Sequence, residues 1–351
     1  MKNKSGIVVL SFPFAAGVAA AAIMDMPQTC AAASSAATAI LLTISILTPK
    51  RCAGALQALF LCLGALCWST AALIPPPARP VSSPAMDALC GLIDNTPFTG
   101  ENSGAIIKAL LTGRRESLAP STITAFRRSG ASHILALSGL HLGVIYLCIR
   151  RLLSPIGNSV PASILRSMLT VGLCGFYTIT TGASPSIVRA FLFILIHEAG
   201  SYAPGRRRSP VSTLCIALTI QLAMRPDLIS SAGFQLSYLA MLGITMLFPR
   251  LEAWYPDSGR PDPVRKIWKT AALSISCQAF TAPAAWVHFR SFPPYFLITN
   301  LIALPLTELV IITAIAALLL QAAGINPQAL AAACGALVQT LEFCLETIAT
   351  I

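Results

Sequence analysis

Residues 131–149 read ASHILALSGLHLGVIYLCI, an apolar run of helical length that carries two serines and two histidines. Similar runs fill the chain, since 55% of its 351 residues are hydrophobic and only 11% are charged. Soluble domains contain about a quarter charged residues, and disordered chains combine high charge with low hydrophobicity. The composition therefore excludes both classes and predicts an all-α, polytopic helical membrane protein.

The apolar runs predict about 10–11 transmembrane helices, because each crossing needs about 20 apolar residues. Prolines inside several runs also predict some broken or re-entrant helices. The expected spans are residues 7–24, 31–48, 53–74, 131–149, 163–181, 185–200, 210–224, 228–248, 271–289, 295–320 and 328–350.

The 24 basic and 13 acidic residues give a net charge of +11. With a cytoplasmic N-terminus, fifteen basic residues fall in cytoplasmic segments and eight on the opposite side. This distribution follows the positive-inside rule and predicts a multi-pass protein with its N-terminus in the cytoplasm. An anionic partner, either lipid headgroups or nucleic acid, is the alternative explanation of the charge. The eleven cysteines form no CxxC or Cys/His pattern, so we expect no metal and no cofactor.

The chain is predicted to divide into three parts. Residues 1–74 hold N-terminal transmembrane helices, 75–130 an extracytoplasmic linker and amphipathic segment, and 131–351 the main transmembrane domain. Between Gly104 and Arg128 the apolar residues fall on one side of a helix, beside basic ones. Basic amphipathic segments next to a bilayer usually lie in its interface, which is where we expect this one.

Polar groups are costly inside a bilayer, so they are the first candidates for function. The densest cluster holds His133, Ser138, Gly139 and His141. On one continuous helix, Ser138 and His141 would share a face, while Gly139 and Gly143 would form a GxxxG surface for close helix approach.

A second cluster surrounds an arginine. Gly182 and Ser184 mark a turn, and Ser184 can cap the helix that follows. Arg189 lies about one turn into that helix. Its side chain either reaches the lipid headgroups or faces a cavity, where guanidinium suits phosphate.

Two further clusters lie in later spans. Gln235 and Ser237 interrupt an apolar run, and interhelical hydrogen bonding is the ordinary explanation for such residues. Pro283, Asn300 and Pro305 lie in two successive spans. Prolines at this depth predict broken helices, which are tolerated where the backbone is buried in protein or lines water.

These clusters occur in an order that resembles the ComEC-type competence family. The matching stretches are HILALSGLHLG at 133–143, TGASPSIVRAFL at 181–192, RPDLISSAGFQLSYLAMLGI at 225–244 and SCQAFTAPAAWVHFRSFPPYFLITNLIALPL at 276–306, preceded by ALLTGRRESL at 109–118. The resemblance implies that 131–351 is a channel or permease core in the cytoplasmic (inner) membrane. It also implies that one strand of DNA passes through it during natural transformation.

The resemblance places a set of residues on the DNA path or its structural motifs: His133, Ser138, Gly139, His141, Gly182, Ser184, Arg189, Gln235, Ser237, Pro283, Asn300 and Pro305. A single strand needs a positively biased route. The loop cations that could form a DNA entrance are Lys108, Arg114, Arg115, Arg127 and Arg128.

Many relatives also carry a soluble domain near the N-terminus and a metallo-β-lactamase-like domain at the end. Residues 75–97 leave little room for the first, and the sequence has no HxHxDH run for a two-metal site. We therefore expect no enzyme and no catalytic residue in this chain. The expected partners are single-stranded DNA and membrane lipid. By resemblance, an external DNA receptor and a cytoplasmic helicase-like motor join them, and a separate nuclease should be needed.

Two alternatives stay open. Ser138 with a histidine would suit an intramembrane serine hydrolase, although residues three apart on one helix diverge, and Ala136 stands where a nucleophile turn favours glycine. A small-molecule transporter could share the fold, and inverted repeats would support it. No such repeat is visible in the sequence.

Overall fold

The computed structural model describes residues 6–24, 30–47, 52–71, 83–157, 159–202, 209–255, 262–290 and 293–350. These ranges are helical and contain no strand, which confirms the all-α fold class. The elements are α1 (Gly6–Ile23), α2 (Cys30–Leu47), α3 (Cys52–Ala71), α4 (Pro84–Asp94), α5 (Ser103–Thr112), α6 (Pro120–Arg128), α7 (Ser132–Leu135), α8 (Gly139–Leu152), η2 (Ser154–Ile156), α9 (Val160–Thr180), α10 (Pro185–Ser201), α11 (Pro210–Met224), η3 (Pro226–Ser230), α12 (Ala232–Met246), α13 (Phe248–Glu252), α14 (Pro263–Phe289), α15 (Phe296–Ala322) and α16 (Gln328–Thr350).

Each expected span except 131–149 corresponds to one of these helices, and most ends agree to within a few residues, although α14 begins eight residues earlier than expected. Within the described ranges, six helical segments are long and apolar enough to cross a membrane. They lie in α1, α3, α8 with η2, α9, α15 and α16. The chain is therefore a multi-pass membrane protein, and crossings by the remaining helices stay a prediction.

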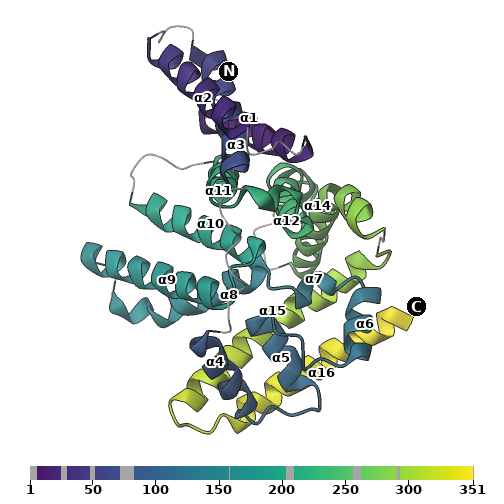
Figure 1. Cartoon of the computed structure of the whole chain (residues 1–351). Coiled ribbons are helices and arrows are strands. Elements are labelled where there is room, and N and C mark those ends of the chain that lie inside the picture. Colours follow the sequence, from purple (N-terminus) through teal and green to yellow (C-terminus); the bar gives the residue numbers. More distant parts are fainter. Residues whose placement is uncertain are drawn as a thin grey trace.

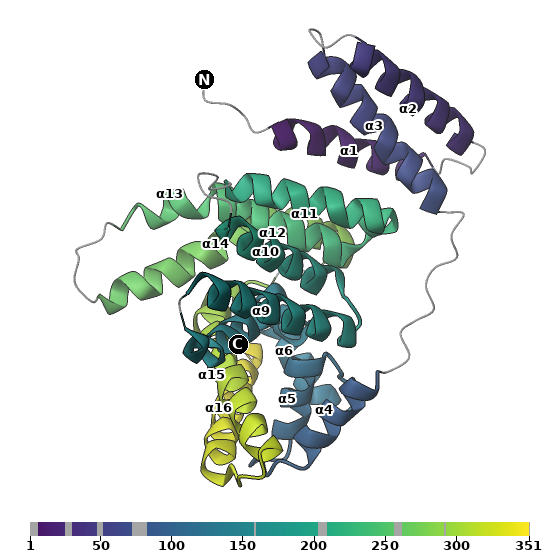
Figure 2. The same ribbon diagram turned by 90° about the vertical axis from the view of Figure 1, so that its left-hand side faces the viewer.

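The helices form three packed groups along the molecule (Figure 1). At one end α1, α2 and α3 pack together and contact α11 and η3. In the middle lie α8 to α14, and at the other end α4, α5 and α6 lie beside α15 and α16 (Figure 2). One cluster of buried side chains joins α1 to α11 and α12, a second lies among α8, α9 and α10, and a third joins α5 and α6 to α15 and α16.

The amphipathic segment packs its apolar face against protein, and its expected place in the lipid interface stays a prediction. It forms two helices, α5 and α6, separated by a turn. The apolar residues Ile106, Ile107, Leu110 and Leu111 are at most 4% exposed and pack in one cluster with α15 and α16. Burial against these long helices removes the apolar face from lipid. The proline-rich linker before α4 falls outside the described residues.

The expected span 131–149 is not one helix. After α7 the backbone is extended at Ala136 and again at Ser138, and α8 begins at Gly139. The prediction of broken helices is wrong at the two prolines, because α14 and α15 run unbroken through Pro283 and Pro305. Each proline removes only one backbone donor, and packed turns on both sides preserve the rest of the helix.

Helices α12 and α14 approach so closely that only glycine fits at one point of contact. A Cβ built on Gly243 would lie 2.2 Å from the carbonyl oxygen of Ser276. We predict that Gly243→Ala lowers the melting temperature of the detergent-solubilised protein, because overpacking of this kind costs about 1–3 kcal/mol.

The matched control is Gly172→Ala in α9, where a Cβ meets no atom within 4 Å. Alanine favours helix over glycine by up to about 1 kcal/mol, so the control should keep or raise the melting temperature. Equal melting temperatures for the two variants would contradict the close approach of α12 and α14.

Candidate functional site

The break before α8 brings Ser138 and His141 into contact. Ser138 is the N-cap of α8, with φ −117° and ψ 167°, and its backbone N–H donates to Nδ1 of His141 at 3.2 Å. The Ser138 hydroxyl oxygen lies 2.7 Å from the same nitrogen. The expectation that these side chains diverge is therefore wrong, because Ser138 lies just outside the helix.

The His141 side chain is 1% exposed, and of its two ring nitrogens only Nδ1 has a hydrogen-bond partner among the described residues. Because Nδ1 accepts the Ser138 N–H, the proton of a neutral ring is assigned to Nε2. Nε2 is buried and has no hydrogen-bond partner in the described part of the chain. The site thus contains an unused N–H donor in the first turn of α8.

Arg189 of α10 lies beside that first turn. A Cβ built on Gly139 would be 3.3 Å from one terminal nitrogen of Arg189, so Gly139 makes the room that the guanidinium needs. The other glycine of the GxxxG pattern, Gly143, has no neighbour within 4 Å of such a Cβ. Only Gly139 therefore serves the close approach that the pattern predicted.

Arg189 is 7% exposed, so its side chain is buried within the protein. Its Cζ lies 5.8 Å from the ring centroid of Tyr238, a weak cation–π contact. Nε and Nη1 have no hydrogen-bond partner among the residues that the structure describes. Since the first turn of a helix also carries partial positive charge, Arg189 and the start of α8 together form an electropositive interior site.

Hydrogen bonds between three helices hold this site in place. The Tyr238 hydroxyl donates to Oε1 of Gln221 at 2.9 Å, and Nε2 of Gln221 donates to the carbonyl of Pro185 at 3.0 Å. Ser237 donates to the hydroxyl of Ser186 at 3.1 Å. Gln221 was missed from the sequence, although a lone glutamine in an apolar run is the signal that could have found it.

Two other predicted residues also present unused polar atoms. Ser184 is the N-cap of α10, following a turn in which Gly182 has a φ of 81°, yet its hydroxyl makes no cap hydrogen bond. The Ser184 hydroxyl and Oδ1 of Asn300 are buried without a partner in the described ranges. Like His141 and Arg189, both therefore offer polar atoms that the fold itself leaves unused.

The remaining predicted residues have local contacts. His133 lies within 3.2 Å of the Gly130 carbonyl, before the break. Gln235 donates to the carbonyl of Ile229 and contacts His288 of α14, each at 2.8 Å. The structure therefore brings Ser138, His141 and Arg189 together but gives His133 and Gln235 structural contacts of their own.

The cations predicted to form an entrance are not equally available. Lys108 pairs with Asp94, and Arg114 with Asp87, both at 2.7 Å. The hydrogen bond that Arg114 donates to the Asp87 carboxylate raises the pKa of the Arg114 guanidinium above its ordinary value. These two charges are largely neutralised by their neighbours.

Arg115 is also committed to the fold, since its Nε donates to the carbonyl of Leu135 in α7 at 3.1 Å. Arg127 and Arg128 differ, because both are exposed in the last turn of α6. No ion pair or hydrogen bond engages their side chains within the described residues. They are therefore the most accessible members of the predicted entrance.

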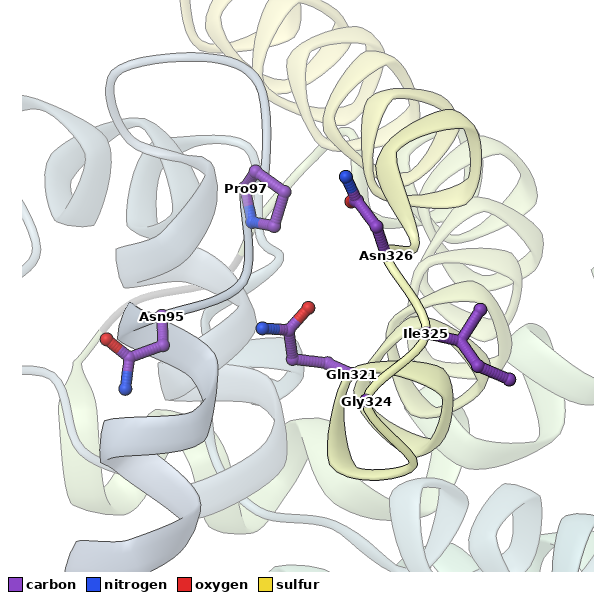
Figure 3. A pocket seen from close by; sticks show the side chains of 6 residues that line it. All are labelled: Asn95, Pro97, Gln321, Gly324, Ile325 and Asn326. Atoms are coloured by element: carbon purple, nitrogen blue, oxygen red, sulfur yellow. The ribbon is translucent and has the colours of Figure 1, made fainter.

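Open hollows lie on the surface of the described part of the chain. One, of about 330 Å³, lies between α4 and the α15–α16 turn and contains none of the predicted site residues (Figure 3). Another, of about 610 Å³, lies between the polar segment and the α9–α10 turn. Arg114 and Gly182 both line it, so it links the predicted entrance to the turn that precedes Arg189.

The sequence pattern of the Competence protein family matches residues 110–351, more than half of the chain. The chain belongs to the competence protein family. The match contains every predicted path residue and confirms the ComEC-type resemblance. Among the cations predicted to form the entrance, Lys108 alone lies outside the matched residues 110–351.

Relatives of this competence domain are distant. ComE operon protein 3 of Bacillus subtilis (strain 168) is 26% identical over 207 residues, which cover 58% of this chain and 25% of that protein. Protein YcaI of Escherichia coli (strain K12), described as uncharacterized, is 24% identical over 219 residues, 61% of this chain and 28% of that protein. An uncharacterized protein of Aquifex aeolicus (strain VF5) is 27% identical over 197 residues, 55% of this chain and 42% of that protein. The chain thus matches less than half the length of each relative, and no solved structure matches it.

Proposed function

We propose that this competence membrane domain conducts single-stranded DNA across the cytoplasmic membrane. The observation that carries the proposal is the buried Arg189, whose Nε and Nη1 lack a partner in the described structure. An unpaired buried charge costs several kcal/mol, so the site favours an anion that arrives from outside the fold. The phosphates of a DNA strand supply such an anion in succession.

The neighbours of Arg189 support a passing phosphate rather than a permanently bound one. His141 offers an N–H, and Ser184 offers a hydroxyl, each buried and unused. These groups recognise phosphate oxygens without reading bases, so conduction is independent of sequence. A single guanidinium with a few neutral donors also binds weakly enough for the strand to move on.

The accessible cations Arg127 and Arg128 form the outer part of the route. Exposed arginines attract a phosphate backbone by a long-range, salt-dependent interaction. The hollow lined by Arg114 and Gly182 lies between the polar segment and α10. In this proposal the domain moves DNA and breaks no bond.

We predict that Arg189→Gln lowers the transformation frequency of the native host, in a strain where deletion of the gene abolishes DNA uptake. Loss of a charge-assisted hydrogen bond costs about 1.5–3 kcal/mol, which is about tenfold to a hundredfold in binding. Arg189→Lys should retain more uptake, because it keeps the charge.

Arg151→Gln is the matched control, since Arg151 is exposed at the end of α8 and lies outside the site. Membrane levels of all variants are compared by immunoblot. Normal uptake by Arg189→Gln at normal protein level would reject the proposed path.

A second prediction concerns Arg127 and Arg128. Replacing both with glutamine should weaken binding of a fluorescent oligonucleotide to the domain in nanodiscs. It should also reduce the slope of log affinity against log salt by about 0.7 for each lost phosphate contact.

The control removes an ion pair without changing net charge, by combining Lys108→Gln with Asp94→Asn. This variant should keep the salt slope of the unaltered domain. If both variants change the slope equally, Arg127 and Arg128 have no special part in the entrance.

A second candidate function, an intramembrane serine hydrolase, is favoured by the 2.7 Å contact between Ser138 and His141. The same two residues also have a structural role at the start of α8, because Nδ1 of His141 accepts the Ser138 backbone N–H. For a conduit we expect no labelling of Ser138 by a fluorophosphonate probe, and normal uptake by Ser138→Thr. Labelling that Ser138→Ala abolishes and Ser186→Ala preserves would instead establish the hydrolase.

A further inference from the structure

A stacked tryptophan pair lies between α13 and α14, outside the site described above. Trp254 and Trp268 have ring centroids 6.3 Å apart and an interplanar angle of 18°. Trp268 is fixed by its indole N–H, which donates to the carbonyl of Leu251 at 2.9 Å. Trp254 is 73% exposed. The Trp254 ring is therefore held in place by the Trp268 ring, while most of its surface stays exposed.

The sequence predicts that α14 crosses the membrane, and the length of this helix would then place the tryptophan pair near a membrane surface. Its 27 residues extend about 40 Å, compared with about 30 Å for the hydrocarbon core. Residues 270–289 carry no Lys, Arg, Asp or Glu and are long enough to cross. The first turns of α14, which carry Arg265, Lys266 and Lys269, then extend into the headgroup region. Figure 2 shows this part of α14 protruding from the bundle beside α13.

Apolar and basic side chains are mixed on the protruding part. Val264 is 55% exposed and Ile267 is 52% exposed. Lys266, between them, is exposed and has no ion pair or hydrogen bond in the described structure. The Arg250 side chain of α13 is exposed, and its one hydrogen bond among the described residues is donated to the Met246 carbonyl. Tryptophan, aliphatic and basic residues together are typical of the boundary between headgroups and acyl chains.

We propose that this surface, formed by Arg250, Trp254, Val264, Lys266 and Ile267, binds anionic phospholipid. Trp254 and the two aliphatic side chains enter the headgroup–acyl boundary, while Arg250 and Lys266 contact lipid phosphates. Lipid acyl chains would pack against the exposed aliphatic side chains, whereas a nucleic acid would leave these side chains in contact with water. The described residues between 248 and 270 include four basic ones, Arg250, Arg265, Lys266 and Lys269, and two acidic ones, Glu252 and Asp262. Their net positive charge attracts anionic lipid.

Lipid bound here would fix one end of the α12–α14 pair. These helices are in close contact at Gly243 and Ser276, and α12 carries Tyr238 against Arg189. The surface is therefore placed to hold the frame of the site without touching it. This inference does not rest on DNA conduction, since the contacts that support it lie entirely in α13 and α14.

The test uses quenching of tryptophan fluorescence by brominated lipid. The full chain with Trp68→Phe and Trp286→Phe retains only Trp254 and Trp268. It is placed in phosphatidylcholine nanodiscs that contain equal amounts of brominated phosphatidylglycerol or brominated phosphatidylcholine. We expect stronger quenching by the anionic lipid, with contact enriched about fivefold for each basic side chain.

Arg250→Gln with Lys266→Gln should remove the preference for anionic lipid, and Trp254→Phe should remove most of the quenching. A matched chain that keeps only Trp286, 53% exposed near the opposite end of α14, should show no preference. Melting temperatures verify that each variant is folded. Equal quenching by both lipids would overturn the proposal. So would weak quenching by lipid together with strong quenching on addition of an oligonucleotide, which would assign the surface to nucleic acid.

Discussion

The proximity of Arg189 to the first turn of α8 is the constraint on which the rest of the site depends. A guanidinium and the positive end of a helix repel one another, and both are buried here without a protein anion among the described residues. Gly139 permits the approach, and the bonds from Tyr238 through Gln221 to Pro185 hold the surrounding helices. The fold thus maintains an unfavourable arrangement that an incoming anion relieves.

This arrangement has the properties that passage of a polyanion requires. The unused donors lie in the first turn of α8 and on α10 with its N-cap, so two helices would contribute to the proposed route. Each of them can donate a hydrogen bond to a phosphate oxygen, the group that a nucleic-acid strand repeats at every nucleotide. Helix α12, which carries Tyr238 beside Arg189, is tightly packed on α14 at Gly243, so the site has a rigid boundary on this side.

The polar segment between α3 and α7 contributes more to the fold than its charge pattern suggests. Its apolar face packs against α15 and α16, and two of its cations are paired with aspartates. Arg115 ties the segment to α7 and hence to the break before α8. Electrostatic attraction at a distance is therefore left mainly to Arg127 and Arg128.

The sequence by itself determined the helical class, the positions of the apolar helices and the family, because hydropathy and motif order are local properties of the chain. It also located Arg189 and Ser138 as candidates, since polar groups are costly in a bilayer. Only the tertiary structure decided that Ser138 caps α8 against His141, that Arg189 faces the interior, and that α14 and α15 continue through their prolines. The structure also decided which entrance cations are accessible: Lys108 pairs with Asp94, whereas Arg127 and Arg128 have no ion pair among the described residues. The Ser138–His141 contact joins residues only three apart and forms because the helix breaks before Gly139. The burial of Arg189 depends on segments distant in the sequence, which no local pattern encodes.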